Sequence, residues 1–254
     1  MEKTKIVFLT GAGISQESGI KTFRDIEDGL WMKFPVMEVA TKSGVFQNVK
    51  QAESFFNVLK EDIKKAKPNA AHLAIAELSK DPRFDVIVIT QNIDDLHTKS
   101  GLKRENIFEL HGNIFELVCR SHPDIYGTDF KSEKGCYHVS KHTEKSWEFP
   151  MQCPKCGKHS TFSPNVVLFD EGLDGQTLAS AFYHAGTADI FIQVGTSSQV
   201  YPAASIIQEV NIDKRVYIDI ADQGVDDFQQ YDTKLIGKAT EKVVEICEKI
   251  KQKY

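Results

Sequence analysis

The hydrophobic positions of this chain fall into short apolar runs separated by amphipathic segments. The run at residues 84–90 is rich in β-branched side chains and has the length of a buried strand. Similar runs predict further strands at residues 6–9, 106–110, 164–169, 189–194 and 215–219. Apolar residues at helical spacing predict helices at residues 45–66, 70–80, 178–185, 201–210 and 238–249. Because strands alternate with helices, we expect an α/β fold with a Rossmann-like, doubly wound, mostly parallel sheet.

One segment of the chain has a different composition. Residues 118–162 contain four of the five cysteines, several histidines and many lysines, with little apolar periodicity. We expect this segment and residues 32–67 to form a smaller lobe, partly helical and partly zinc-binding. The large lobe would comprise roughly residues 1–31, 68–117 and 163–254.

The cysteines of this segment predict one structural zinc ion. Cys153 and Cys156 are separated by two residues, and Cys119 and His122 have the same spacing. Two such pairs supply four ligands, which fill a tetrahedral zinc site and leave no coordination position for water or substrate. The metal would therefore support folding and not catalysis. Cys136 is an alternative to His122 as the fourth ligand. In a protein that is not secreted, such clustering favours metal over disulfides.

The composition narrows the class of protein. The chain has 254 residues, of which 41% are hydrophobic and 26% are charged, as in ordinary globular proteins. A net charge of −5 argues against nucleic acid as the main partner. No apolar run has the length of a membrane span or a signal peptide, so we expect no membrane association and a cytoplasmic location. We also expect a monomer.

Polar or glycine-rich sequence follows five of the predicted strands. These stretches are Gly11-Ala12-Gly13, Gln91-Asn92-Ile93-Asp94, His111-Gly112, Gly195-Thr196-Ser197 and Asp219. The carboxyl ends of parallel strands meet at one edge of a sheet, where ligands bind in open α/β folds. A Gly-x-Gly turn can place N–H groups near a phosphate, but Gln16 replaces the third glycine of the dinucleotide fingerprint. The turn could therefore equally be a purely structural one, and Arg24 could pair with a diphosphate or be a surface charge.

In this order and spacing, the motifs resemble those of the sirtuins, which are NAD-dependent protein deacylases. The resemblance covers nearly the whole chain. It rests on Gly11–Ser15, Thr22–Arg24 with Gly29–Trp31, Thr90–Asp94 with Leu96-His97, His111-Gly112, the cysteine segment, Pro164–Phe169, Gly195–Ser197 and Gly237–Ala239. It implies that NAD is the co-substrate and that an acyl-lysine protein or peptide is the substrate. The products would be nicotinamide, the free lysine and O-acyl-ADP-ribose.

The resemblance also implies roles for individual residues. His111 would be the general base, and Asn92 would order water and the ribose; His97 is expected to pack against its helix instead. The NAD contacts would be Gly11, Ala12, Gly13, Ser15, Thr22, Phe23, Arg24, Trp31, Gln91, Asn92, Ile93, Asp94, His111, Gly195, Thr196, Ser197, Asp219 and Ala239. The acyl-lysine substrate would contact Val167, Leu168, Phe169, Phe56 and Leu59, and its backbone would add as a strand beside residues 166–169.

The chain departs from the usual pattern of the sirtuins at several positions. These are Lys21, Asp25, Asp170, Asp219 and His122, in place of proline, glycine, glycine, asparagine and cysteine. Phe56 and Leu59 replace the tyrosine and arginine of desuccinylating members, so we expect a preference for uncharged acyl groups. Mono-ADP-ribosyl transfer, NAD hydrolysis and non-catalytic NAD sensing are the alternative functions for the same site.

Overall fold

The computed structural model describes residues 3–20, 36–121, 134–142, 145–149, 151–158, 162–196, 201–210, 215–221 and 233–254. The chain divides into two compact units. The first comprises Met1–Thr22, Ala66–His111 and Leu173–Tyr254, and the second comprises Phe23–Lys65 and Gly112–Gly172. The sequence-based boundaries assign residues 112–117 and 163–172 to the large lobe instead. Residues 112–117 and 163–166 group with the second unit because β4 and β6 pair there in a separate sheet.

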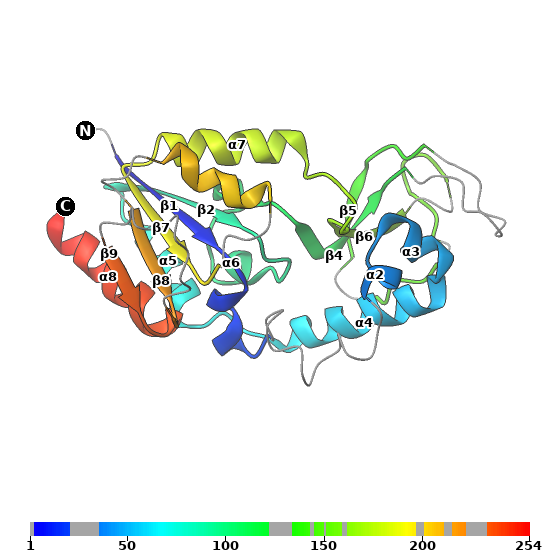
Figure 1. The fold of residues 1–254 in the computed structure, drawn as a ribbon, viewed down its shortest axis with the longest axis horizontal. Coiled ribbons are helices and arrows are strands. Elements are labelled where there is room, and N and C mark those ends of the chain that lie inside the picture. The colour runs from blue at the N-terminus through cyan, green and yellow to red at the C-terminus, as the bar shows by residue number, and fades with distance from the viewer. Residues whose placement is uncertain are drawn as a thin grey trace. The chain divides into compact units, whose positions relative to one another are not determined.

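A six-stranded parallel sheet forms the centre of the first unit (Figure 1). Its strand order is β3-β2-β1-β7-β8-β9. The strands are β1 (Thr4–Thr10), β2 (Phe84–Thr90), β3 (Ile107–Glu109), β7 (Ile190–Val194), β8 (Arg215–Asp219) and β9 (Thr233–Ile236). The strand order reverses direction between β1 and β7, which makes this position the topological switch point of a doubly wound sheet. The predicted α/β fold with a mostly parallel sheet is therefore confirmed.

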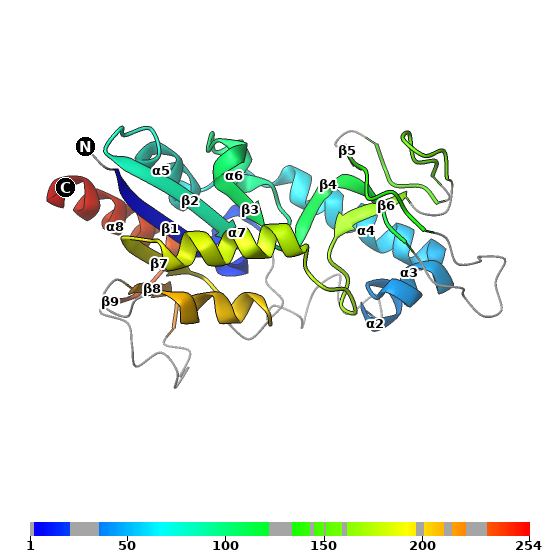
Figure 2. The same cartoon turned by 90° about the horizontal axis from the view of Figure 1, so that it is seen from above.

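Helices cover both faces of this sheet (Figure 2). Successive side chains of β1 alternate between the faces, as the twofold period of a strand requires. Ile6 and Phe8 pack with α5 (Ala70–Leu78) and α8 (Ala239–Lys253). Val7 and Leu9 pack with α7 (Gly175–Gly186) and the 3-10 helix η5 (Ala203–Glu209). Burial on both faces explains why these strands are continuous apolar runs in the sequence.

The second unit contains a three-stranded antiparallel sheet and, among its described residues, three helices. Its strands are β5 (Val139–Lys141), β4 (Gly112–Cys119) and β6 (Phe162–Val166), in the order β5-β4-β6, and its helices are α2 (Val36–Val39), α3 (Lys42–Gln47) and α4 (Val49–Lys65). The single helix expected at residues 45–66 is thus divided in two at Asn48. The strand expected at residues 164–169 lies in this smaller sheet and ends at Val166.

Aromatic side chains form much of the core of the second unit. Trp147 is 1% exposed and packs edge-on against Phe56, with ring centroids 6.1 Å apart. Lys60 of α4 is also buried, and its amino group donates to the backbone oxygens of His142 and Lys145. These contacts fix the segment before Trp147 against α4, and they satisfy a charge that would otherwise be costly to bury.

Short elements complete the connections of the first unit. They are the 3-10 helices η1 (Ala12–Ile14), η2 (Gln16–Ser18) and η4 (Arg104–Asn106), and the single-turn helix α6 (Leu96–Lys99). Asn69 is the N-cap of α5, and its side-chain oxygen accepts from the N–H of Ala71 at 3.0 Å.

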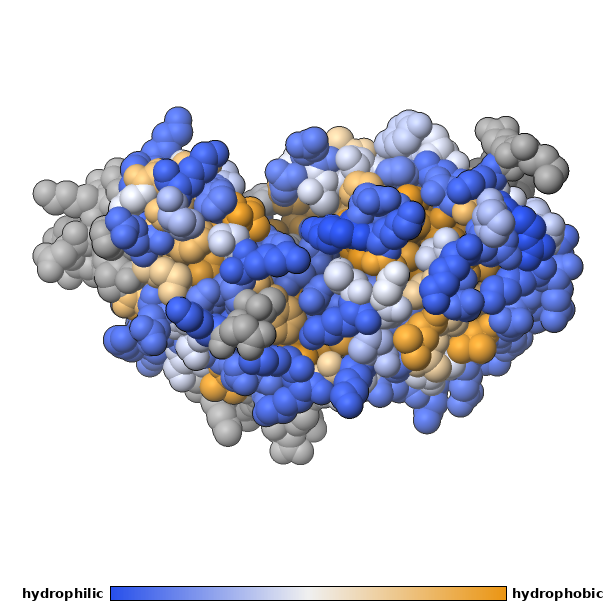
Figure 3. Space-filling model, turned by 180° about the vertical axis from the view of Figure 1, so that it is seen from behind, coloured by the Kyte–Doolittle hydropathy of each residue, from blue (hydrophilic) through white to orange (hydrophobic). Residues whose placement is uncertain are grey.

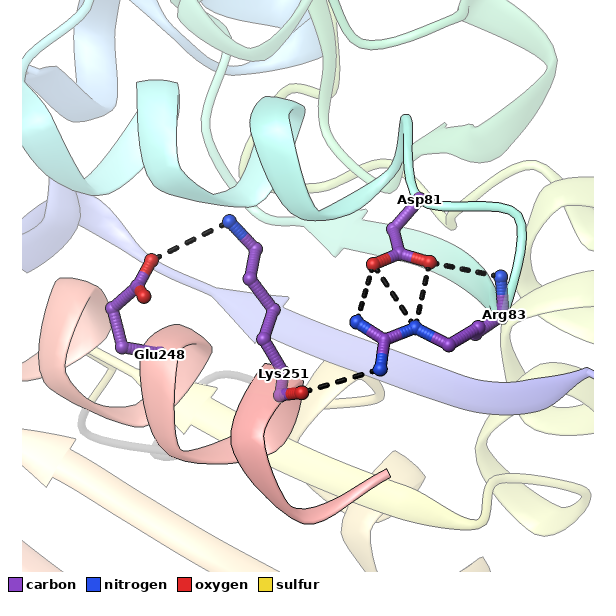
Figure 4. A network of polar contacts seen from close by, with 4 residues as sticks. All are labelled: Asp81, Arg83, Glu248 and Lys251. Carbon is purple, nitrogen blue, oxygen red and sulfur yellow. Dashed lines mark hydrogen bonds and ion pairs between the residues drawn. The ribbon is translucent and has the colours of Figure 1, made fainter.

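Arg83 pairs with Asp81 within the turn before β2 and also links this turn to the end of α8 by a hydrogen bond (Figure 4). The guanidinium of Arg83 contacts both carboxylate oxygens of Asp81 and also donates to the backbone oxygen of Lys251 at 3.3 Å. The hydrogen bonds from Arg83 lower the pKa of Asp81 to about 2. Arg83 thereby supplies a cationic donor to the C-terminal end of α8.

The surface is mixed in character. On the face shown in Figure 3, hydrophilic side chains predominate and apolar ones lie in small groups between them. Within the described ranges, no helix has both the length and the apolar character that a membrane crossing requires.

Candidate active site

Two glycine-containing turns contact each other at the switch point between β1 and β7. The N–H of Gly11 donates to the oxygen of Val194 at 3.0 Å, and the N–H of Gly13 donates to the oxygen of Gly195 at 2.9 Å. A Cβ atom on Gly13 would lie 2.6 Å from the Cα of Gly195, which itself has a φ of 58°. Only glycine permits this approach, so the close contact of the two turns alone explains both residues.

The first turn already uses most of its N–H groups. Besides Gly11 and Gly13, Ile14 and Ser15 donate to backbone oxygens of the same turn. Within residues 11–15, and among partners in the described part of the chain, only the N–H of Ala12 has no protein acceptor. A phosphate at this turn would therefore be bound by one N–H and by side chains, not by a row of N–H groups as in a complete dinucleotide fingerprint.

A hydrogen-bonded network joins the loop after β2 to the first turn. The hydroxyl of Ser15 donates to Asp94 at 2.5 Å, and the amide of Asn92 donates to the oxygen of Gly11 at 3.0 Å and to Ser15 Oγ at 3.1 Å. Burial raises the pKa of Asp94, while the hydrogen bonds from Ser15 and from the N–H of Leu96 oppose this rise. The polar cluster predicted from the sequence is thus assembled at the carboxyl ends of β1 and β2.

His111 follows β3 and is held by the same loop. Its Nδ1 atom lies 2.8 Å from the backbone oxygen of Gln91. A carbonyl can only accept, so Nδ1 carries the proton and Nε2 presents a lone pair. Burial lowers the pKa of His111, against the opposing effect of the Gln91 carbonyl. At neutral pH the imidazole is therefore uncharged and able to act as a general base.

The amide of Gln91 links this loop to the turn after β7. It donates to Thr196 Oγ1 at 3.0 Å, and Gln193 donates to the backbone oxygen of Thr196 at 3.1 Å. The ends of β1, β2, β3 and β7 are thus joined by side-chain hydrogen bonds, and they carry four of the five polar stretches noted in the sequence.

His97 lies beneath the site, in contact with a second histidine. It is 3% exposed, its Nε2 atom lies 3.0 Å from Thr10 Oγ1, and its ring centroid lies 4.9 Å from that of His72. His97 belongs to α6 and is buried, and its ring contacts His72 of α5. The partnership with His72 could not be predicted, because no spacing pattern relates a residue of α5 to one of α6.

The remaining NAD contacts implied by the resemblance lie at β8 and α8 or outside the described residues. Asp219 ends β8, and one of its carboxylate oxygens accepts from the N–H of Ile220 at 2.7 Å. Ala239 begins α8 and is buried. Ile93 lies half-buried in the loop after β2. Thr22, Phe23, Arg24, Trp31 and Ser197 lie outside the described residues, together with the substitutions Lys21 and Asp25.

Sequence reasoning missed one residue near this end of the site. Glu17 accepts hydrogen bonds from the N–H of Thr240 at 3.1 Å and from its hydroxyl at 2.7 Å. Lys238 Nζ lies 3.7 Å from the same carboxylate. Glu17 therefore caps the start of α8 from the segment that follows the glycine turn. No local pattern could reveal this contact, because the two segments are far apart in the sequence.

The residues expected to bind the substrate lie in the second unit. Leu168 is buried, whereas Phe169 is 57% exposed and its N–H donates to the oxygen of Ala40 at 3.0 Å. Phe56 is buried in the aromatic core described above, and Leu59 is half-buried. Asp170 accepts from the N–H of Lys42 at 2.5 Å, so this substitution adds a cap to α3.

Four cysteines of the second unit gather into one cluster. The sulfurs of Cys119, Cys136, Cys153 and Cys156 all lie within 4.8 Å of one another, with two of the separations at 3.6 and 3.7 Å. A tetrahedron with Zn–S bonds of about 2.3 Å has edges of about 3.8 Å, so the cluster fits a structural zinc ion.

Cys136 supplies the fourth thiol of this cluster, where the spacing of the sequence favoured His122. The four thiols complete a tetrahedral set without a histidine, and His122 itself lies outside the described residues. Burial raises the pKa of Cys153, but N–H groups of Cys156 and Lys155 and the neighbouring thiols outweigh it and bring the pKa to about 7. A thiol in this state is readily deprotonated for metal binding.

Comparisons with known proteins decide the family. The model of the Sir2 family matches residues 11–202, which span the glycine turn, the His111 loop, the cysteine cluster and the turn after β7. The chain belongs to the Sir2 family.

Relatives within the Sir2 family match most of the chain. A protein of Pyrococcus furiosus named NAD-dependent protein deacylase is 42% identical over 229 residues, which cover 85% of each chain. A protein of Archaeoglobus fulgidus named NAD-dependent protein deacylase 2 is 40% identical and covers 98% of this chain and 92% of its own.

Solved Sir2 structures agree in fold. A Sir2 homologue in complex with NAD has a TM-score of 0.79 and 32% identity, and it covers 99% of this chain and 91% of its own. A Sir2 protein bound to acetylated peptide has a TM-score of 0.70 and 27% identity, covering 98% and 94%. The resemblance to the sirtuins that the sequence indicates is therefore confirmed for the family and the fold.

Proposed function

We propose that this Sir2-family protein is an NAD-dependent protein lysine deacylase. The observation that carries the proposal is the uncharged His111, whose Nε2 lone pair is left free because Nδ1 is hydrogen-bonded to the backbone of Gln91. Acyl transfer to a ribose hydroxyl needs a base that takes the proton of that hydroxyl, and a neutral imidazole with a free ring nitrogen can serve. The names of the relatives support the same activity.

The residues of the first unit fit a bound dinucleotide. NAD would supply the sugar carbon that loses nicotinamide and the hydroxyl that accepts the acyl group. His111 Nε2 would take the proton of that hydroxyl. Asn92 would orient the ribose and water, since its amide nitrogen is already fixed by Gly11 and Ser15 and its oxygen points to no other described side chain.

The two ends of the dinucleotide would meet different groups. Asp94, with a raised pKa and a fixed orientation, would hold the carboxamide of nicotinamide. Asp219 has one carboxylate oxygen held by Ile220, so the other can accept from a ribose diol. A carboxylate there would repel a 2′-phosphate and so favour NAD over NADP.

The acyl-lysine peptide would bind along the segment that follows β6. Beyond Val166 this segment belongs to no strand, and its exposed Phe169 offers an apolar contact for the acyl chain. The peptide would add its backbone as a strand to residues 166–169.

The four cysteines would hold one zinc ion, which supports the fold of the second unit and takes no part in the reaction. A cytoplasmic location and a monomeric state stay predictions.

The proposal is tested by mass spectrometry of the products formed from NAD and a panel of acetyl-, octanoyl- and succinyl-lysine peptides. We expect nicotinamide, free lysine peptide and O-acyl-ADP-ribose in equal amounts, with acetyl or octanoyl peptides converted faster than succinyl. Nicotinamide and ADP-ribose formed equally well without a peptide would indicate NAD hydrolysis instead. ADP-ribose attached to protein would indicate a transferase, and faster desuccinylation would refute the acyl preference.

A further inference from the structure

One arginine of the second unit is almost completely buried and makes an unusual set of contacts. Arg120 directly follows β4 and is 5% exposed. Its Nε donates to the hydroxyl of Ser163 at 2.8 Å, and its Nη2 donates to the backbone oxygens of Pro164 at 2.7 Å and Val166 at 3.1 Å. Its Nη1 forms an ion pair with Glu171. The guanidinium thus contacts both β6 and the turn beyond it.

Glu171 completes the connection from the other end of the segment. The same carboxylate oxygen that pairs with Arg120 accepts from the N–H of Leu168 at 3.2 Å, and the N–H of Glu171 donates to the oxygen of Leu168 at 2.9 Å. Residues 168–171 therefore form a turn with two hydrogen bonds, one between backbone groups and one to the Glu171 carboxylate. Since Arg120 contacts both this carboxylate and β6, it connects the turn to β6.

The segment between these two supports has little regular structure of its own. β6 ends at Val166, and residues 167 and 168 belong to no strand. Of the next two N–H groups, that of Leu168 bonds to Glu171 and that of Phe169 bonds to Ala40. Without a strand ladder, the shape of this segment depends on these contacts with Glu171 and Ala40.

We propose that Arg120 and Glu171 are positioning residues that hold Val167–Phe169 in the fixed shape to which an acyl-lysine peptide pairs. The inference rests on the proposed function, in which this segment binds the peptide. A segment that is already fixed loses less conformational freedom when a peptide pairs with it, so binding is stronger. The planar, five-donor guanidinium suits this role because it can contact several acceptors at fixed angles.

The alternative explanation is that the pair serves stability alone. A buried ion pair is weak evidence for stability, because desolvation of both charges offsets much of their attraction. A purely structural role would lower the unfolding temperature of a variant but leave the KM for peptide of the folded protein unchanged. The two explanations therefore differ in the KM for peptide measured below the unfolding transition.

The test uses Glu171→Ala and Glu171→Gln in the full chain, with KM measured separately for acetyl-lysine peptide and for NAD. The alanine removes the acceptor for Leu168 and for Arg120, so we expect a rise in the KM for peptide of about tenfold with the KM for NAD unchanged. The glutamine keeps an acceptor oxygen, and its KM for peptide should rise only ~2- to 3-fold. Glu116→Gln is the matched control, because Glu116 bonds to the side chain of Asn165 on β6 and not to its backbone. Its KM values should equal those of the wild type.

Arg120→Lys keeps the charge but lacks the fork that spans Pro164 and Val166, so it provides a second variant should Glu171→Ala not fold. We expect it to retain zinc, which must be measured because Cys119 is adjacent, and to raise the KM for peptide while the KM for NAD stays constant. Unchanged KM for peptide in folded, zinc-containing Glu171→Ala or Arg120→Lys overturns the inference. An inactive wild type would instead overturn the proposed function.

Discussion

The Nδ1 atom of His111 lies 2.8 Å from the backbone oxygen of Gln91, and this single contact fixes which ring nitrogen can act as a base. The loop that supplies the oxygen also carries Asn92 and Asp94. The tautomer and orientation of the His111 ring, and the polar groups beside it, are therefore set by the loop after β2. The ability of His111 to act as a base depends on the geometry of this loop, and its pKa gives a prediction for the pH dependence.

The pH dependence of deacylation should show an acid limb set by His111. The base must be uncharged, and burial lowers its pKa from the usual value of 6.5. We expect kcat/KM for acetyl-lysine peptide to be constant above about pH 6.5 and to fall at lower pH. An acid limb centred above pH 7 would contradict the lowered pKa. The profile should be measured at saturating NAD with a peptide that has no ionisable side chains.

Folding stability should fall on acidification through the buried histidines beneath the site. Burial lowers the pKa of His72 to about 4, and burial followed by the charge of His72 lowers the pKa of His97. Both are uncharged in the folded state and protonate near pH 6.5 when unfolded, so stability is complete above that pH. It decreases as the pH falls toward 4, by about 3 kcal/mol from His72 alone.

Urea unfolding at pH 7 and pH 4.5 measures this effect. His72→Gln removes one titrating group, so its stability should change less between the two pH values than that of the wild type. Equal pH dependence in both proteins would show that His72 is not the group responsible.

Substitution of the first-turn glycine should harm both fold and activity. Gly13→Ala places a Cβ atom 2.6 Å from the Cα of Gly195, so one of the two backbone segments must shift. We expect a loss of about 1–3 kcal/mol in unfolding free energy and weaker NAD binding. Gly175→Ala is the matched control because no atom lies within 4 Å of its added Cβ, and it should be neutral or slightly stabilising. Thermal unfolding and NAD titration of the two variants provide the comparison.

The zinc ligands can be assigned by metal analysis of single variants. Cys136→Ala should lose the ion and unfold the second unit, because three thiolates leave an incomplete tetrahedral site. His122→Ala should retain one zinc per chain. Cys247→Ala should also retain it, since burial raises the pKa of Cys247 to about 12 and this residue lies in the first unit. Loss of zinc from His122→Ala, with retention in Cys136→Ala, would reverse the assignment.

The sequence predicted the parts of the fold in which neighbouring residues determine the structure. The β-branched run at residues 84–90 coincides with β2, and the helix predicted at residues 70–80 is found as α5, because both depend on local composition. The strand ends that carry Asn92 and His111 could also be located, since polar residues follow apolar runs there.

The remaining features depend on contacts between distant segments. The pairing of β4 with β6 has no local signal, because residues 112–119 neither alternate regularly nor form a continuous apolar run. Spacing alone favoured His122 over Cys136, since the path of the chain between Cys119 and Cys153 cannot be read from spacing. The contact of Arg120 with Glu171 likewise arises only after β6 has folded against β4.

The most direct test of the account is a comparison of two reactions in His111→Ala, given NAD and acetyl-lysine peptide. His111 is assigned to deprotonate a hydroxyl after nicotinamide has left, so the variant should still release nicotinamide in a peptide-dependent way. Its formation of free lysine peptide and O-acetyl-ADP-ribose should fall by about 100-fold or more. Wild-type deacetylation by folded His111→Ala would contradict the assignment of His111 as the base.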